Sequence, residues 1–363
     1  MLIKYIKYLG ETQGEIMSKI NKKISMLIVL ILCLTVASFV LVACKASNKE
    51  KVYLITMDGT DEHWVRVHKG AKEAYDAATD KNFDFEWSTP TEGNGTNDKQ
   101  QIALIEQATA NNAKVIILAA AVSPDATANA VKEAIGNGVK FIYVDSPASV
   151  TGDGIIQTVK TDNEAGGYQG GKELVKRLKE SSKEEELKGK TIQIYLPDAT
   201  AGVLSRAAGF KKAVEEDEFK TQQEESGKEP KDTQDKANAL ITDDSIVAFY
   251  GVNEGTTVGI GNAIKENKGT TKVGAGFDAS SNIDSHLKDG SLLFTVQQQP
   301  DVMGKTTMAT AIKFMNGEDM SSINKDVATE TVIHDKDNLR VSNMHLSSTN
   351  NFWYALPIRK DVA

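Results

Sequence analysis

Short apolar runs alternate with helical patterns through most of the chain, and this alternation constrains the fold more than any other feature. The runs at residues 115–119 and 141–144 are continuously apolar, as expected of strands that helices cover on both faces. The pattern then starts again, with runs at residues 191–196, 246–251 and 272–277. Strands that alternate with helices over this length predict an α/β protein with two doubly wound parallel sheets.

Residue spacing supplies the remaining expected elements. Trp64, Val67 and Ala71 recur at intervals of three and four, which predicts a helix with one apolar face. The expected strands cover residues 51–56, 83–87, 115–119, 141–144, 191–196, 246–251, 272–277 and 292–298. The expected helices cover residues 64–78, 98–111, 124–134, 163–185, 204–215, 235–241, 256–267 and 303–315.

Composition and charge exclude several classes of protein. The chain has 363 residues, of which 40% are apolar and 25% charged, which is typical of a soluble globular protein of two domains. Its formal net charge is −8, so it lacks the basic surface that nucleic-acid binding requires. Only two cysteines occur, too few for a disulfide framework. We expect no nucleic-acid partner and a monomer.

The first 43 residues have the pattern of a secretory signal. Lysines precede nineteen uncharged, almost entirely apolar residues at 24–42. Leu41-Val42-Ala43-Cys44 resembles the bacterial lipobox, in which the peptide is cut before the cysteine and a diacylglyceryl group is attached to its sulfur. We expect a signal peptide at residues 1–43, a lipid on Cys44 and a tether at 44–51. An uncleaved anchor is the alternative, and either Met1 or Met17 could be the start.

Open parallel sheets bind ligands beyond the carboxyl ends of their strands, so the residues at these ends are candidates for a site. They are rich in carboxylates and amides and lack the donors of a phosphate site. They lie at 57–61, 119–122, 145–146, 197–198, 253–254, 278–279 and 297–298.

Enzyme motifs are weak or absent. Residues 274–279 fit G-x-G-x-x-A, but the next strand ends in glutamines and offers no acid to hold a ribose. His63 and His68 lie about 140° apart around a helix and cannot share a metal ion from one face. No phosphate-binding loop and no nucleophile elbow occurs. The sequence therefore predicts no enzyme, no cofactor and no metal.

The strand ends resemble those of the periplasmic sugar-binding proteins of ABC importers, in the ribose-binding family. The resemblance covers nearly all of residues 51–335, and the order and spacing of its motifs make it specific. Its motifs are Gly70-Ala71, Ser123-Pro124-Asp125-Ala126, Tyr143-Val144-Asp145-Ser146, Thr161-Asp162-Asn163 with Gly166-Gly167, Ser205-Arg206 with Gly209-Phe210, Val252-Asn253-Glu254, Gly276-Phe277-Asp278 and Gln298-Gln299-Pro300.

The resemblance implies the type I periplasmic-binding fold, with two lobes joined by three crossing segments and the ligand between the lobes. The first lobe is expected at residues 51–161 and 300–327, and the second at 162–299 and 328–363. The crossings are expected near Asp162, Gln298 and Asp326.

The same resemblance assigns the ligand-binding residues. Asp145 and Asp278 match carboxylates that accept hydrogen bonds from vicinal hydroxyl groups. The other matches are Arg206 as a donor, Asn253 and Gln298 as amides, and Trp64 as an aromatic on the sugar ring. Asp61 and His63 fall where the family has an asparagine and a second aromatic. Ser146 and Phe277 complete the expected ligand-binding set. Alternatively, Trp64 belongs to the core, the aspartates cap helices and Arg206 forms a surface ion pair.

Three departures from the family pattern put ribose itself in doubt. Ser146 stands where a ribose binder has arginine, Ala120 stands in place of asparagine, and residues 226–230 lack the expected aromatic. The sequence predicts a lipid-anchored binding protein for a monosaccharide or similar polyol, outside the cytoplasmic membrane, that delivers its ligand to an ABC permease. The alternatives are a sensory module that serves a membrane receptor, and a binder of a nucleoside or a furanosyl autoinducer.

Overall fold

The computed structural model describes residues 49–91, 98–120, 125–182 and 184–339. The described residues from Lys51 onward form one compact unit, in which the described strands make two six-stranded sheets. Cys44, Ser123 and Pro124 lie outside the described residues, and so does the expected signal peptide. No helix in the described part of the chain is long and apolar enough to cross a membrane.

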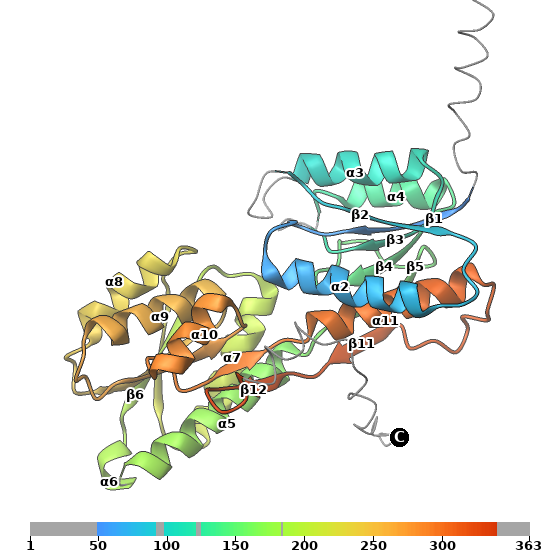
Figure 1. The fold of residues 1–363 in the computed structure, drawn as a ribbon. Coiled ribbons are helices and arrows are strands. Elements are labelled where there is room, and N and C mark those ends of the chain that lie inside the picture. The colour runs from blue at the N-terminus through green and yellow to red at the C-terminus, as the bar shows by residue number, and fades with distance from the viewer. Residues whose placement is uncertain (1–48, 92–97, 121–124, 183, 340–363) are drawn as a thin grey trace, which may run out of the picture. The chain divides into compact units, whose positions relative to one another are not determined.

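The first sheet is entirely parallel, with the strand order β11-β5-β4-β3-β1-β2. Its strands are β1 (Lys51–Ile55), β2 (Asp84–Ser88), β3 (Ala113–Leu118), β4 (Lys140–Val144), β5 (Ile155–Thr161) and β11 (Asp326–Thr329). Helices α2 (Glu62–Ala77) and α11 (Pro300–Met315) cover one face of this sheet. Helices α3 (Asp98–Ala110) and α4 (Ala128–Gly136) cover the other face (Figure 1).

The second sheet has the order β12-β10-β9-β8-β6-β7, and only its edge strand β12 is antiparallel. Its strands are β6 (Thr191–Leu196), β7 (Lys220–Glu225), β8 (Ile246–Gly251), β9 (Val273–Phe277), β10 (Thr295–Gln297) and β12 (Val332–His334). Helices α5 (Asn163–Ser181) and α7 (Ala201–Glu215) pack on one face. Helices α8 (Pro230–Leu240), α9 (Glu254–Glu266) and α10 (Ser281–Asp289) cover the other, and α6 (Glu184–Leu187) is one short turn.

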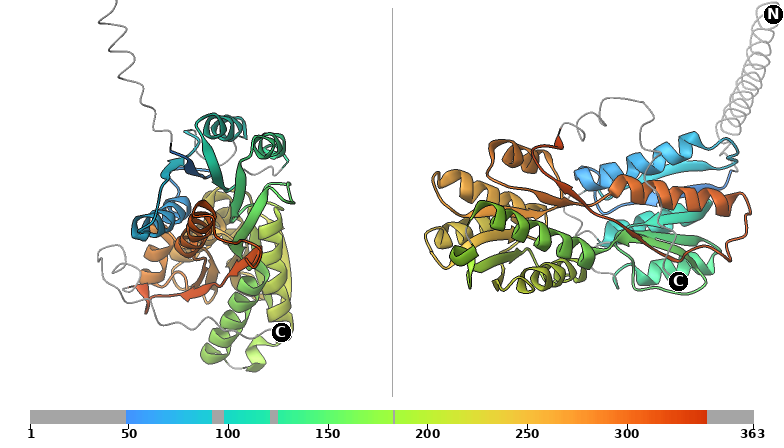
Figure 2. Two further views of the ribbon diagram at one scale, coloured as in Figure 1. Left: turned by 90° about the vertical axis from the view of Figure 1, so that its right-hand side faces the viewer. Right: turned by 90° about the horizontal axis from the view of Figure 1, so that it is seen from below.

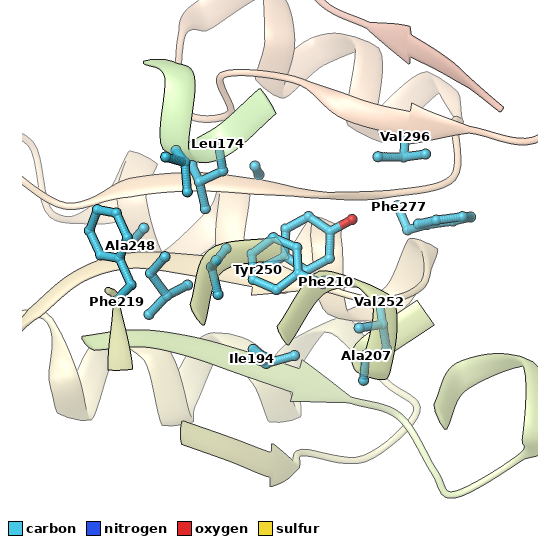
Figure 3. Close-up of a cluster of buried hydrophobic side chains, with 14 of the residues drawn as sticks. Leu174, Ile194, Ala207, Phe210, Phe219, Ala248, Tyr250, Val252, Phe277 and Val296 are labelled. Carbon is cyan, nitrogen blue, oxygen red and sulfur yellow. The ribbon is translucent and has the colours of Figure 1, made fainter. Parts of the chain in front are cut away.

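The central strands are buried on both faces, as their continuous apolar runs predict. Every residue of β6 is buried, and the stacked rings of Phe210 and Tyr250 lie 3.7 Å apart in the core of this lobe (Figure 3). The two expected α/β lobes, each with a doubly wound sheet, are therefore confirmed.

Two helix pairs pack backbone against backbone at glycines. A Cβ atom at Gly167 of α5 would collide with the carbonyl oxygen of Arg206 on α7, and one at Gly209 with that of Glu164. A Cβ atom at Gly70 of α2 would meet the carbonyl oxygen of Asp301 on α11 in the same way. Figure 2 shows α2 and α11 running side by side in both views. The glycines in the sequence motifs therefore allow these helices to approach closely.

The chain passes between the two sheets at three places within the described residues. It leaves β5 at Thr161 and enters α5, it leaves β10 at Gln297 and enters α11, and it passes from β11 to β12 through residues 330–331. Strand β11 extends to Thr329 in the first sheet, so the third passage follows Asp326 by several residues.

Some elements differ from the sequence-based expectation. Strands β5, β7, β11 and β12 and helix α10 had no counterpart in it. The expected helix at 163–185 ends at Ser181, and α6 is a separate turn. Strand β10 is shorter than the expected 292–298, because only Thr295–Gln297 pairs with its neighbours.

Candidate functional site

Asp278 is the centre of a polar cluster at the end of β9. Its Oδ1 accepts a hydrogen bond from Nε2 of Gln298 at 2.7 Å, and its Oδ2 accepts one from the backbone N–H of Glu254 at 3.1 Å. Nη1 of Arg206 lies 3.5 Å from the same Oδ2. The aspartate adopts φ +73°, a left-handed conformation that aspartate tolerates better than most residues. It does not cap the following helix, because Ser280 is the N-cap of α10.

Gln298 connects this cluster to the first sheet. Its Oε1 accepts a hydrogen bond at 2.7 Å from Oγ1 of Thr161, the last residue of β5. Gln298 is only 5% exposed. Its Nε2 carries two N–H groups, of which one donates to Asp278, so the other can donate to a ligand. Two passages between the sheets therefore meet at a buried amide.

Arg206 projects from α7 and is held from several sides. Its Nε donates to Asn163 at 2.8 Å, its Nη1 donates to the carbonyl oxygen of Val252 at 3.1 Å, and its guanidinium lies 4.1 Å from the centre of the Phe277 ring. The side chain is 9% exposed, so it is not a surface ion pair. Its Nη2 makes no hydrogen bond to another described residue and can donate to a ligand.

His63 and Asp145 face each other in the first lobe. Nε2 of His63 lies 3.5 Å from Oδ2 of Asp145, which makes an ion pair when the imidazole is protonated. Burial lowers the pKa of His63, but the contact with Asp145 and the charges of Asp278 and Asp61 outweigh it, so the pKa is raised above its usual 6.5. Burial raises the pKa of Asp145, but His63 and the charge of Arg206 lower it in net. Asp145 also adopts a left-handed φ, +60°, at the end of β4.

Two further carboxylates lie near this cluster from opposite lobes. Asp61 is the N-cap of α2 and accepts a hydrogen bond from the backbone N–H of His63. Glu254 is the first residue of α9. Loss of hydration raises the pKa of both side chains, and the charge of Asp278 raises each further. The charge of Asp61 also contributes to the raised pKa of Glu254.

The two aromatic residues of the expected set, Trp64 and Phe277, are both buried. Trp64 is 7% exposed and packs with the residues of β1 and β3, so the alternative core assignment describes its surroundings. Phe277 is fully buried beneath Arg206. Both support the residues in front of them, His63 and Arg206, rather than presenting a face to solvent.

Asn253 and Ser146 complete the set of expected residues. Oδ1 of Asn253 accepts from the backbone and hydroxyl groups of Thr256 and so caps α9, which leaves its Nδ2 able to donate. Ser146 follows Asp145 and is half-buried, and its backbone carbonyl accepts from Ala120 at 2.7 Å. Hydrogen bonds or ion pairs thus connect Asp278, Gln298 and Arg206 with one another, and His63 with Asp145.

Three contributors were missed by the sequence-based site assignment. They are Glu254, Thr161 and Asn163. Glu254 was visible as a strand-end residue, and Thr161 and Asn163 form part of a motif. Their roles depend on contacts across 24 to 137 residues of chain, which no local pattern reveals.

Two hollows of the described surface lie elsewhere. One of about 730 Å³ runs along α5 between Asp162 and Lys176, and one of about 360 Å³ lies between α3 and α4. The described residues contain no group of three or more His, Cys, Asp or Glu side chains that could hold a metal ion. The strand-end cluster therefore remains the best candidate, because it joins carboxylates, amides and an arginine from both sheets.

Comparison with known families agrees with this geometry. The family model described as periplasmic binding protein domain matches residues 52–319. This chain belongs to the periplasmic binding protein family.

Relatives within this family include proteins of ribose import. The ribose import binding protein of Escherichia coli (strain K12) is 24% identical over 279 residues, which are 76% of this chain and 88% of that protein. The ribose import binding protein of Haemophilus influenzae is 27% identical over 222 residues, 60% of this chain and 72% of that protein. The resemblance to the ribose-binding family that the motifs indicated is thus confirmed.

Solved structures of periplasmic binding proteins share the fold. An arabinose-binding protein from Geobacillus stearothermophilus has a TM-score of 0.70 at 18% identity, over 81% of this chain and 99% of that chain. A carbohydrate transporter solute-binding protein from Agrobacterium radiobacter, in complex with D-arabinose, has a TM-score of 0.67 at 24% identity, over 83% and 99% of the two chains.

Proposed function

We propose that this protein is the extracytoplasmic substrate-binding protein of an ABC importer and that it binds a monosaccharide or similar polyol. The observation that carries the proposal is the cluster around Asp278, to which the carboxyl ends of strands in both sheets contribute. Parallel α/β sheets bind ligands at this edge. Membership of the periplasmic binding protein family and the printed names of the ribose import relatives support it.

Each polar group has a role that follows from its chemistry. Asp145 and Asp278 accept hydrogen bonds from hydroxyl groups, and Arg206 donates to ligand oxygen atoms through its Nη2. Asn253 and Gln298 each retain amide N–H groups for the ligand. None of these groups is arranged as a nucleophile with a base, so the proposed role is binding and release without chemical change.

We propose that the first lobe comprises residues 51–161, 300–329 and that the second comprises 162–299 and the segment from residue 332. The ligand then closes the lobes on each other by rotation about the three passages between the sheets. Small-angle X-ray scattering tests this motion, because the radius of gyration should fall when a saturating ligand is added. An unchanged profile at saturation would reject closure and leave binding itself intact.

A thermal-shift screen of residues 45–363 against a panel of sugars and polyols tests the proposed function. A ligand present at about 100 times its Kd stabilises the native state by ~2.7 kcal/mol, which is readily measured. A hit is then titrated by calorimetry. If no monosaccharide or polyol at millimolar concentration shifts the melting temperature, the proposed function is wrong.

We further propose that Cys44 is lipidated and holds the mature protein at the outer face of the cytoplasmic membrane. The motif Leu41-Val42-Ala43-Cys44 supports this proposal. Replacing Cys44 by alanine should release the protein from membranes or leave it unprocessed, as fractionation and mass spectrometry would show. A Cys44→Ala protein that is still processed and still needs detergent would contradict lipidation.

A further inference from the structure

Basic side chains cover the aromatic residues beneath the candidate site. The imidazole of His63 lies 4.6 Å from the Trp64 ring, and the Trp64 side chain is 7% exposed. The guanidinium of Arg206 lies 4.1 Å from the centre of the Phe277 ring, which is fully buried. Neither aromatic therefore offers a free face on which a sugar ring could stack.

A neighbouring aromatic residue, Trp87, is half-buried and has one face occupied by a histidine. Trp87, at the end of β2, stacks face to face on His68 at 4.0 Å and donates through Nε1 to Thr56. Residues 226–230, 92–97 and 121–124 contain no aromatic residue. Beyond the described residues, the C-terminal part of the sequence contains Phe352, Trp353 and Tyr354.

Stacking matters because a pyranose has an apolar face of C–H groups. An aromatic ring buries that face at little entropic cost, and ligand sites generally combine such apolar surface with a few placed polar groups. A linear polyol has no fixed face of this kind, because its chain rotates about each C–C bond. A site without a free aromatic face therefore loses more affinity for a pyranose than for a linear polyol.

The balance of donors and acceptors favours the same class. The ring oxygen of a pyranose only accepts hydrogen bonds, whereas every oxygen of a linear polyol also donates. Asp145, Asp278, Asp61 and Glu254 contribute carboxylates, which only accept. The donors left for a ligand are few, namely Nη2 of Arg206 and the amide groups of Asn253 and Gln298, because Nε2 of His63 is buried and faces Asp145.

Other charged groups at the edge of the cluster do not reverse this balance. Lys228 lies 3.7 Å from Asp198, so its ammonium group has a carboxylate partner of its own. Asp58 has its Oδ1 occupied by the backbone N–H of Asp61 and by Thr60. The carboxylates of Asp61 and Glu254 remain as acceptors without a basic partner of that kind.

From these contacts we infer that the site selects an acyclic polyol, the open-chain reduced form of a sugar, over the corresponding pyranose. The inference rests on the proposed function, because it names the ligand class of the same cluster. His63, in place of the family aromatic, is the specificity-determining residue. Its imidazole pairs with Asp145 through Nε2, whereas an aromatic in its place would supply a stacking face.

Calorimetric titration of the full chain, purified in detergent, tests the inference. The probes are ribitol, D-arabinitol and D-glucitol, each compared with D-ribose, D-arabinose and D-glucose. We expect the best polyol to bind at least tenfold tighter than the best pyranose. A pyranose that binds as tightly or tighter overturns the inference and leaves the proposed function standing. Binding by neither set overturns both.

A His63→Phe variant tests the assigned cause. Restoring an aromatic ring should shift the ratio of polyol to pyranose affinity toward the pyranose by about tenfold. His68→Phe on the same helix is the matched control and should leave the ratio unchanged. An unchanged ratio in His63→Phe overturns the role of His63. A wild-type preference for pyranoses that disappears when Phe352, Trp353 and Tyr354 are replaced by alanine overturns the inference and identifies those residues as the source of stacking.

Discussion

Replacing Asp278 by alanine should weaken ligand binding strongly, because this carboxylate is the most connected group of the site. It accepts from Gln298 at 2.7 Å and from the backbone of Glu254 at 3.1 Å, and it pairs with Arg206 at 3.5 Å. A hydrogen bond to a charged group contributes about 1.5–3 kcal/mol, and its loss also leaves ligand hydroxyls unpaired. We expect a loss of about 2–4 kcal/mol in binding, which is roughly 30- to 1000-fold in Kd.

The same substitution should also lower the free energy of unfolding, more than the sequence alone suggests. The sequence alone predicts little change in stability, because a carboxylate at the rim of a site supports little of the core. In the structure it satisfies two neighbouring donors, and alanine at φ +73° adds backbone strain of about 1 kcal/mol. Removing the charge of Asp278 also removes its repulsion of Asp61 and Glu254, which offsets part of the lost stability. We expect a net decrease of roughly 2 kcal/mol.

Two variants separate these contributions. Asp278→Gly removes the carboxylate without the strain, so it should lose affinity like alanine but retain more stability. Asp278→Asn keeps one acceptor oxygen for two donors, Nε2 of Gln298 and the backbone N–H of Glu254, so its affinity for the ligand should fall about tenfold. Calorimetric titration gives Kd, and urea denaturation gives the free energy of unfolding.

Asp335 provides the matched control. Its carboxylate, 16% exposed, pairs with Nη2 of Arg177 at 2.6 Å, far along the chain from the strand-end cluster. Asp335→Ala should lower stability by a similar amount and leave Kd unchanged. If Asp278→Ala binds within threefold of wild type, the site has been placed wrongly and the roles assigned to its neighbours fail with it.

The remaining predictions concern charge and packing. The pKa of His63 is raised above 6.5 in the folded protein, so its protonation should stabilise the native state below pH 6.5. This added stability should disappear as the pH rises through the folded pKa. Urea denaturation from pH 6 to 8.5 measures it, and a His63→Phe variant whose pH profile is identical to that of wild type would contradict the prediction. Gly167→Ala should cost about 1–3 kcal/mol of unfolding free energy, because no rotamer removes its collision with a backbone carbonyl, whereas Gly136→Ala, with open space around it, should cost nothing. Asp61→Asn keeps an N-cap of equal quality and removes a crowded charge, so it should raise the unfolding free energy by several tenths of a kcal/mol, and a clear loss of stability would refute the repulsion.

The sequence predicted the buried strands well because their signal is local. Strand β6, for example, is buried along its whole length and reads as an apolar run. Strand β7 (Lys220–Glu225) could not be recognised, because this edge strand is mostly exposed and contains no apolar residue. Strand β12 is short and exists through its pairing with β10, a partner more than thirty residues earlier in the chain.

The sequence indicated which residues gather at the strand ends but not which way their side chains point. Asp145, Asp278 and Gln298 follow strands, so their common location follows from the topology of parallel sheets. Whether an aromatic faces the ligand or the core depends on what packs in front of it. The positions of His63 over Trp64 and of Arg206 over Phe277 are tertiary contacts, and residue type alone does not disclose them.

The glycine contacts between helices have a mechanical consequence for the proposed closing motion. Helices α5 and α11 each begin directly after a passage between the sheets, and each presses its backbone against a neighbour, α7 or α2. At these contacts no flexible side chain lies between the two helices, so neither helix can shift against its neighbour by a change of rotamer. A few degrees of torsion at Thr161 or Gln299 would therefore be carried undiminished to the far end of a lobe. Each helix pair would therefore rotate as one rigid body about a hinge that lies beside the proposed ligand site.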